Sequence, residues 1–171
     1  MKLPSKTITF WSLAVVITVL DFITKQLAEA SLTRGRPVEI LGEYLRFTLG
    51  YNTGIAFGLS VGDSSRWLLV GVTVLTMAMI FWLFSSIDER HKAQIIAFGL
   101  IMGGAAGNLL DRMFGNYGVI DFIDVGLGST RFWTFNIADS AITVGAILLI
   151  LGSLFERDKG AVGVRGGTAA R

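Results

Sequence analysis

Two aspartates stand in apolar surroundings, and together they could perform acid–base chemistry on an amide bond. Asp121 is flanked by Ile120 and Phe122, and Asp139 follows Ile137 and Ala138. When two carboxyl groups share a site, their repulsion keeps one of them protonated. The ionised group can take a proton from a water that attacks an amide carbonyl, while the protonated group gives its proton to the leaving nitrogen. This chemistry requires neither a metal ion nor a covalent intermediate.

The same two residues allow other interpretations. A carboxylate at a helix N-terminus is stabilised by the helix dipole, which would account for Asp139 alone. Buried aspartates also carry protons or ions in small coupled membrane transporters, although a transporter should place them nearer the membrane midplane. A structural membrane subunit is a third alternative. The residue types and spacing leave these alternatives open.

Cysteine and histidine usage excludes several other kinds of active site. The chain has no cysteine, which excludes disulfides, thiolate metal sites and a cysteine nucleophile. Its one histidine, His91, lies between Arg90 and Lys92 and is expected in a solvated loop. A histidine-rich metal site or a Ser-His-Asp triad is therefore not expected. The formal net charge of +2 is too small to indicate nucleic-acid binding.

Further polar residues recur at helical spacing. Asp21 and Lys25 are four residues apart, so they share one helix face and can form an ion pair or anchor a neighbouring loop. Asn108, Asp111 and Arg112 also share a face. An unpaired buried ion is costly, so Asp111 is expected to pair with the adjacent Arg112.

A short polar segment around Asn52-Thr53-Gly54 offers recognition groups. Asn, Thr and Gly in this order are typical of a turn. The alternative is that Asn52 points into the site and orients a substrate backbone or a carboxylate. The spacing of Gly99, Gly103 and Gly107 is typical of a flat helix stripe that lets another helix approach closely.

Composition indicates which elements must position these groups. Of 171 residues, 52% are hydrophobic and only 16% are charged, whereas soluble domains carry about 25% charged residues. A membrane-spanning helix needs about 20 mostly apolar residues. The chain contains four such stretches, so we expect an all-α membrane protein. The expected spans lie near residues 8–28, 67–87, 94–113 and 138–155.

Four spans put both chain ends on one side of the membrane. Lys and Arg are denser in the short segments 1–6, 88–92 and 156–171, which favours cytoplasmic termini. The long outer segment 29–66 must then have structure or function, and its alternating residues 44–49 are strand-like. The tail 156–171 has no apolar face and is expected to be disordered.

Five motifs in order resemble one family, the bacterial lipoprotein signal peptidases (signal peptidase II). The resemblance runs from about residue 14 to residue 155 on a four-helix chain. The matching motifs are Asp21-x3-Lys25, Tyr51-Asn52-Thr53-Gly54-x-Ala56-Phe57, Gly103-Gly104-Ala105-x-Gly107-Asn108-Leu109-x-Asp111-Arg112, Val119-x-Asp121-Phe122 and Phe135-Asn136-x-Ala138-Asp139-x2-Ile142-x2-Gly145.

The resemblance implies an intramembrane aspartic endopeptidase of the bacterial inner membrane. It implies that Asp121 and Asp139 are the catalytic pair, that no cofactor is needed, and that cleavage falls just before the diacylglyceryl-modified cysteine of a prolipoprotein. Lipidated prolipoproteins and membrane lipids are the expected partners, and the protein is expected to be a monomer. It also implies a small periplasmic β-rich cradle and a short periplasmic helix beside the four spans. The supporting and substrate-binding positions it implies are Asn52, Gly54, Asn108, Asp111, Arg112, Asn136 and Ala138.

Overall fold

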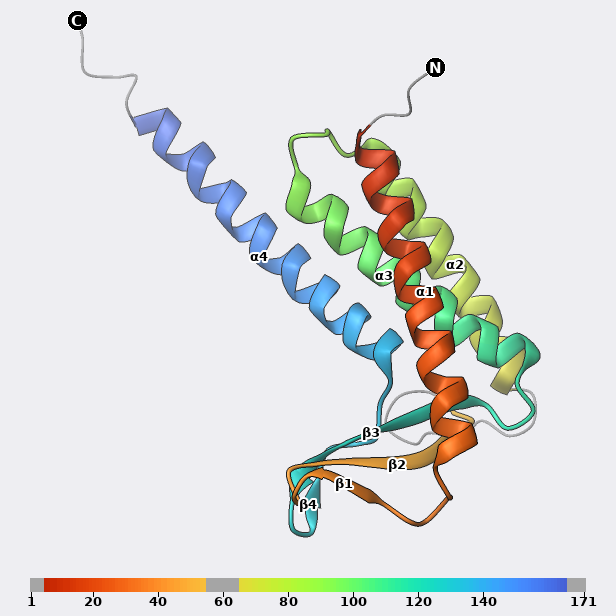
Figure 1. The fold of residues 1–171 in the computed structure, drawn as a ribbon. Helices are drawn as coiled ribbons and strands as arrows, with labels where there is room; N and C mark the ends of the chain where they lie inside the picture. The colour runs from red at the N-terminus through yellow and green to blue at the C-terminus, as the bar shows by residue number, and fades with distance from the viewer. Residues whose placement is uncertain (1–4, 55–64, 166–171) are drawn as a thin grey trace, which may run out of the picture.

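A computed structural model describes residues 5–54 and 65–165 of the chain. Within these residues, four helices carry a small antiparallel sheet across one end (Figure 1). The helices are α1 (Ser5–Ser31), α2 (Ser65–Ser86), α3 (Lys92–Phe114) and α4 (Ile137–Arg165). The strands are β1 (Val38–Leu41), β2 (Leu45–Asn52), β3 (Val119–Leu127) and β4 (Thr130–Arg131).

Three of the described helices are long and apolar enough to cross a membrane. These are α1, α2 from Arg66 onward, and α3, while the apolar stretch Ile137–Gly152 of α4 is shorter. Large apolar side chains such as Leu75 and Trp82 lie exposed on the outside of α2. Apolar side chains are stable in such positions when lipid surrounds them. The described helices are therefore those of a membrane protein, and three of the four expected spans are long and apolar enough to cross a bilayer.

Helix α3 lies at the centre and packs against the other three helices (Figure 1). The small residues along it explain the close approach. A Cβ on Gly103 would lie 2.7 Å from the carbonyl oxygen of Ala14 on α1, and a Cβ on Gly104 would overlap the backbone of Ala138 on α4. The packing stripe expected from the glycine spacing is confirmed against α1, and the adjacent Gly104 allows a second close approach, to α4.

The sheet has the order β1-β2-β3-β4, with every pair antiparallel. Strand β2 contains the strand-like residues expected near 44–49, so that prediction is confirmed. The central strand β3 leads from the end of α3 toward the start of α4, and Gly50 of β2 lies opposite Asp121. A register shift between Phe47 and Gly50 interrupts the ladder beside this position.

A buried charge cluster holds the sheet together. Asp124 is 4% exposed and accepts hydrogen bonds from Arg46, Arg131 and the Thr48 hydroxyl at 2.8 to 3.1 Å. Burial by itself would raise the pKa of Asp124, but the hydrogen bonds from Arg131, Thr48 and Arg46 outweigh it and lower the pKa below its usual value. The cluster joins β2, β3 and β4 through one carboxylate.

The predicted end of the last helix differs from the structure, and two other predicted segments lie wholly or partly outside the described residues. Helix α4 continues to Arg165 instead of ending near residue 155, so the predicted end came too early. Residues 156–159 are Glu, Arg, Asp and Lys, which include good helix formers and explain the continuation. Residues 166–171 of the tail predicted to be disordered, and residues 55–64 of the segment predicted to hold a short helix, lie outside the described residues.

Candidate active site

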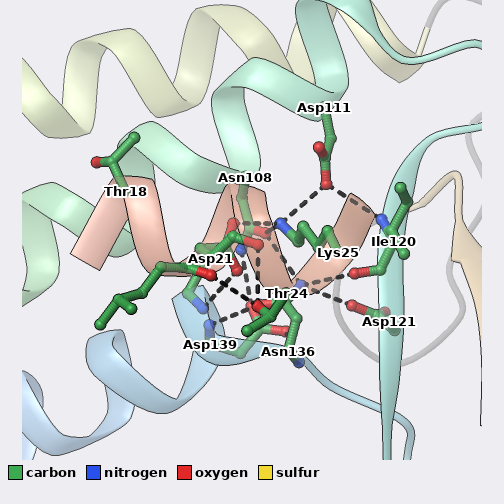
Figure 2. Close-up of polar contacts among 12 residues, drawn as sticks. Thr18, Asp21, Thr24, Lys25, Asn108, Asp111, Ile120, Asp121, Asn136 and Asp139 are labelled. Carbon is green, nitrogen blue, oxygen red and sulfur yellow. Dashed lines mark hydrogen bonds and ion pairs between the residues drawn. The ribbon is translucent and has the colours of Figure 1, made fainter. Parts of the chain in front are cut away.

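The two candidate carboxylates lie where the sheet meets the start of α4. Asp121 is on β3, and Asp139 is in the first turn of α4 (Figure 2). Asp121 is buried, and Asp139 is partly exposed. Both lie at the sheet end of the helices, opposite the end where α1 begins and α4 ends (Figure 1).

Asn136 contacts both carboxylate-bearing residues. Its side-chain amide donates to Asp121 Oδ1 at 2.7 Å, and its side-chain oxygen accepts the backbone N–H of Asp139 at 2.9 Å. Asp139 Oδ2 in turn accepts the backbone N–H of Asn136 at 3.3 Å. This reciprocal pattern is a capping box at the start of α4. The helix cap therefore fixes where the two carboxylates stand relative to each other.

Asn108 on α3 joins the same network from the opposite side. Its Nδ2 donates to Asp139 Oδ1 at 2.8 Å, and its Oδ1 accepts from Asn136 Nδ2 at 3.1 Å. Asn136 Nδ2 also donates to the backbone oxygen of Ile120 at 3.2 Å. The two asparagine amides thus connect α3, β3 and α4 around the two aspartates (Figure 2).

A buried cation lies beneath the asparagines. Lys25 is 1% exposed, and its Nζ lies 2.6 Å from Asp21 Oδ2, 2.8 Å from Asp111 Oδ2 and 2.9 Å from Asn108 Oδ1. Asp21 is fully buried, and its other oxygen accepts the backbone N–H of Ala138 at 2.8 Å. Asp21 and Lys25 thus form the expected ion pair, and its other contacts are to α3 and the first turn of α4 rather than to a loop.

The partner expected for Asp111 was wrong. Asp111 pairs with Lys25 on α1 and accepts the backbone N–H of Ile120, whereas the guanidinium of Arg112 donates to the carbonyl oxygen of Asn108. Adjacent residues on a helix point about 100° apart, so a contact between neighbours is unfavourable. The charge of Arg112 acts on Asp139, Asp111 and Asp121 together. The backbone groups of Ile120 belong to the network too, and no residue type in the sequence signals them.

The Asn52 segment fits both of its interpretations. Asn52 Oδ1 accepts the backbone N–H of Gly54 at 3.0 Å, which is an Asx turn. The same side chain also hydrogen-bonds Asp121. Strand β2 ends at Asn52, and Asn52 pairs with Val119 of β3. The turn therefore places an amide beside one of the two carboxyl groups.

The surroundings favour the protonated form of Asp121. Burial raises its pKa most, and the negative charge of Asp139 raises it further; hydrogen bonds from Asn136 and Asn52 and the charge of Lys25 oppose these effects, leaving the pKa at about 7. The repulsion between Asp121 and Asp139 is the expected property of two carboxyl groups that share a site. At neutral pH, such a pair can supply both a protonated and an ionised carboxyl group.

A cavity of about 300 Å³ borders the network near the ends of α1 and α3. It is lined by Gln26, Glu29, Tyr51 and Asp111, among others, and its lining includes neither Asp121 nor Asp139. Tyr51 donates to Glu29 at 2.8 Å at its rim. The cavity therefore touches the network at Asp111 but does not contain the carboxyl pair.

Comparisons with known proteins identify the family of the chain. The family model described as Signal peptidase (SPase) II matches residues 13–155. The chain is 41% identical to the lipoprotein signal peptidase of Hydrogenovibrio crunogenus over 92% of both chains. It is 36% identical to that of Francisella tularensis subsp. novicida over 93% of this chain and 99% of the relative.

Solved structures give the same result at the level of the fold. One bacterial membrane enzyme, determined by the in meso method at 2.3 Å, superposes with a TM-score of 0.79 and 28% identity, covering 88% of this chain and 90% of that one. A second bacterial membrane enzyme, determined by the same method at 1.9 Å, superposes with a TM-score of 0.76 and 29% identity, covering 85% of this chain and 92% of that one. The extent of these matches and the ordered motifs show that the chain belongs to the signal peptidase II family of membrane peptidases.

Proposed function

We propose that this protein is an aspartic endopeptidase that removes the signal peptide from diacylglyceryl-modified prolipoproteins. The observation that carries the proposal is the pair Asp121 and Asp139, held together by Asn136 at the sheet end of the helices. Two coupled carboxyl groups are sufficient for hydrolysis of an amide by water. Family membership supports a peptidase over the alternative of an ion-coupled transporter.

The two carboxyl groups take different roles. Asp139 accepts N–H groups from the side chain of Asn108 and from the backbone at the start of α4. Asp121 is more deeply buried, and its pKa of about 7 allows it to carry a proton at neutral pH. Asp139 takes the proton of the attacking water. Asp121 hydrogen-bonds the substrate carbonyl and then protonates the leaving nitrogen.

The position of the site fits a lipidated substrate. A prolipoprotein presents an apolar signal helix and an attached diacylglyceryl group, so cleavage just before the modified cysteine requires access from lipid as well as from water. The carboxyl pair lies at the end of the apolar helices, beside the sheet (Figure 1). The substrate amide must be extended at the moment of cleavage, because a helical amide is already hydrogen-bonded.

The proposal includes a membrane arrangement. We place the protein in the bacterial inner membrane with four spans, both termini in the cytoplasm, and the sheet and carboxyl pair at the periplasmic face. The beginning of α1 and the far end of α4 lie at one end of the bundle, which supports an even number of spans (Figure 1).

The direct test uses purified full-length protein in detergent with a diacylglyceryl-modified prolipoprotein and its unmodified precursor. The expected result is release of the signal peptide from the modified substrate, with the new N-terminus at the lipidated cysteine. Absence of processing, together with ion or proton flux in sealed vesicles, would support the transporter alternative instead. Processing at another bond would contradict the proposed cleavage site.

A further inference from the structure

Lys25 makes three close polar contacts in the buried network, two ion pairs and one hydrogen bond. An ammonium group has three N–H donors and no acceptor. In this structure those donors meet Asp21, Asp111 and Asn108 at 2.6, 2.8 and 2.9 Å. One carboxylate is enough to balance one cation and Lys25 already has two, so the third contact, to a neutral amide, requires its own explanation.

That third contact fixes the orientation of the Asn108 amide. Because Lys25 Nζ can only donate, the atom of Asn108 that faces it must be the oxygen. Asn136 Nδ2 imposes the same choice, since it also donates to Asn108 Oδ1. The Asn108 NH2 group therefore faces Asp139, to which it donates at 2.8 Å. The reverse orientation would place an oxygen against a carboxylate.

The rest of the chain offers Asp139 a mixed set of charges. Arg112 of α3 and Asp121 of β3 interact electrostatically with Asp139. Lys25 and Asp21 of α1 and Asp111 of α3 lie in the same polar network. Three of these groups are acidic and two are basic. An oriented amide donor and the start of α4 therefore decide which of the paired carboxyl groups keeps the negative charge.

We infer that Lys25 and Asn108 are positioning residues that keep Asp139 ionised and so make it the water-activating base. The inference rests on the proposed peptidase function. Neither residue touches the reacting bond in this account. Lys25 orients the amide of Asn108, and that amide donates the hydrogen bond to Asp139.

The test is the pH dependence of kcat/KM for Asn108→Asp and Asn108→Leu, measured on purified protein with a lipidated precursor. Asn108→Asp keeps an oxygen toward Lys25 but places a carboxylate against Asp139, which favours its protonated form. We expect the acidic limb of the profile to move upward by about one pH unit. Asn108→Leu removes the donor without adding a charge, so we expect a smaller upward shift of the acidic limb. This variant tests the inference if Asn108→Asp does not fold.

Thr18→Val is the matched control for a purely structural effect. Thr18 lies on the same α1–α3 interface and donates to the carbonyl oxygen of Gly103 at 3.1 Å, outside the network around Asp139. This variant should lower the melting temperature slightly and leave the pH profile unchanged. Folded Asn108 variants with the wild-type profile would overturn the inference, even if their melting temperatures fall.

The two proposals can fail separately. If Asp121→Asn and Asp139→Asn still cleave the substrate, the aspartic mechanism fails and the inference fails with it. If both of those variants are inactive while folded Asn108 variants keep the wild-type pH profile, only the positioning role is wrong.

Discussion

The side chain of Asn136 donates to Asp121 Oδ1 at 2.7 Å and at the same time caps the helix that carries Asp139. One residue thus couples the geometry of the carboxyl pair to the start of α4. In most helices a capping residue contributes only to stability. Here the cap also sets the spacing of the proposed acid and base.

Asn136→Ala tests this coupling. The variant loses the cap, which costs about 1 kcal/mol of stability, and it also frees Asp121 to move relative to Asp139. We expect kcat/KM to fall by about 100-fold, because a misplaced catalytic group loses most of its effect. Thermal unfolding measured beside the kinetics separates the two effects. A loss of stability with unchanged kcat/KM would contradict the coupling.

The raised pKa of Asp121 predicts a basic limb in the pH–rate profile. Asp121 must be protonated to donate a proton, so activity should fall as pH rises through about 7, where burial and the charge of Asp139 place its pKa. Measuring kcat/KM between pH 5 and about 9 checks this prediction. A profile that stays flat through that range would show that Asp121 is not the acid.

The same pKa has a consequence for stability. The folded protein holds this proton up to about pH 7, whereas the unfolded chain releases it near 3.8. Between these values the folded state binds more protons, so the free energy of unfolding should fall as pH rises through the window. Asp121→Asn should flatten that dependence, which equilibrium unfolding at several pH values can measure. An unchanged slope would argue against the raised pKa.

Glycine at position 107 is expected to be essential. A Cβ there would overlap the carboxylate of Asp21, which is fully buried and paired with Lys25. Gly107→Ala should therefore lower both the melting temperature and the activity. Gly71→Ala on α2, where a Cβ meets no atom within 4 Å, is the matched control and should leave both unchanged or raise stability slightly. Equal behaviour of the two variants would contradict this account of Gly107.

Asp124 should contribute to stability and not to the reaction. Asp124→Ala leaves the guanidinium groups of Arg46 and Arg131 without their shared carboxylate, and the expected loss is about 2 kcal/mol. At a temperature where the variant is folded, kcat/KM should stay within about twofold of wild type, a difference of less than 1 kcal/mol. A larger loss of activity in folded protein would show that the sheet cluster also positions Asp121.

Much of the fold could be predicted from local pattern. Burial and lipid contact both favour apolar side chains, so the order of apolar residues along the sequence indicates them. This is why the apolar runs of α1, α2 and α3 and the alternation in β2 could be recognised. The end of α4 could not be placed from the sequence. Polar helix formers such as Glu156 and Lys159 can extend a helix, but they also occur in tails without regular structure.

Contacts between distant segments were harder to predict. Asp111 stands next to Arg112 in sequence but pairs with Lys25, because helix geometry turns neighbours apart and brings α1 against α3. Asp124 was not singled out, since its arginine partners lie on other strands and no local spacing reveals strand pairing. Asp121 and Asp139 stood out because charged groups in apolar surroundings are rare and costly.

The most direct test of the central claim is cleavage of a diacylglyceryl-modified prolipoprotein by Asp121→Asn and by Asp139→Asn. Each substitution keeps the size of the side chain and removes one ionisable carboxyl group. Both purified variants should show wild-type helix content and a cooperative thermal transition, and both should release no detectable signal peptide. Substantial cleavage by either folded variant would contradict the assignment of this pair as the catalytic acid and base.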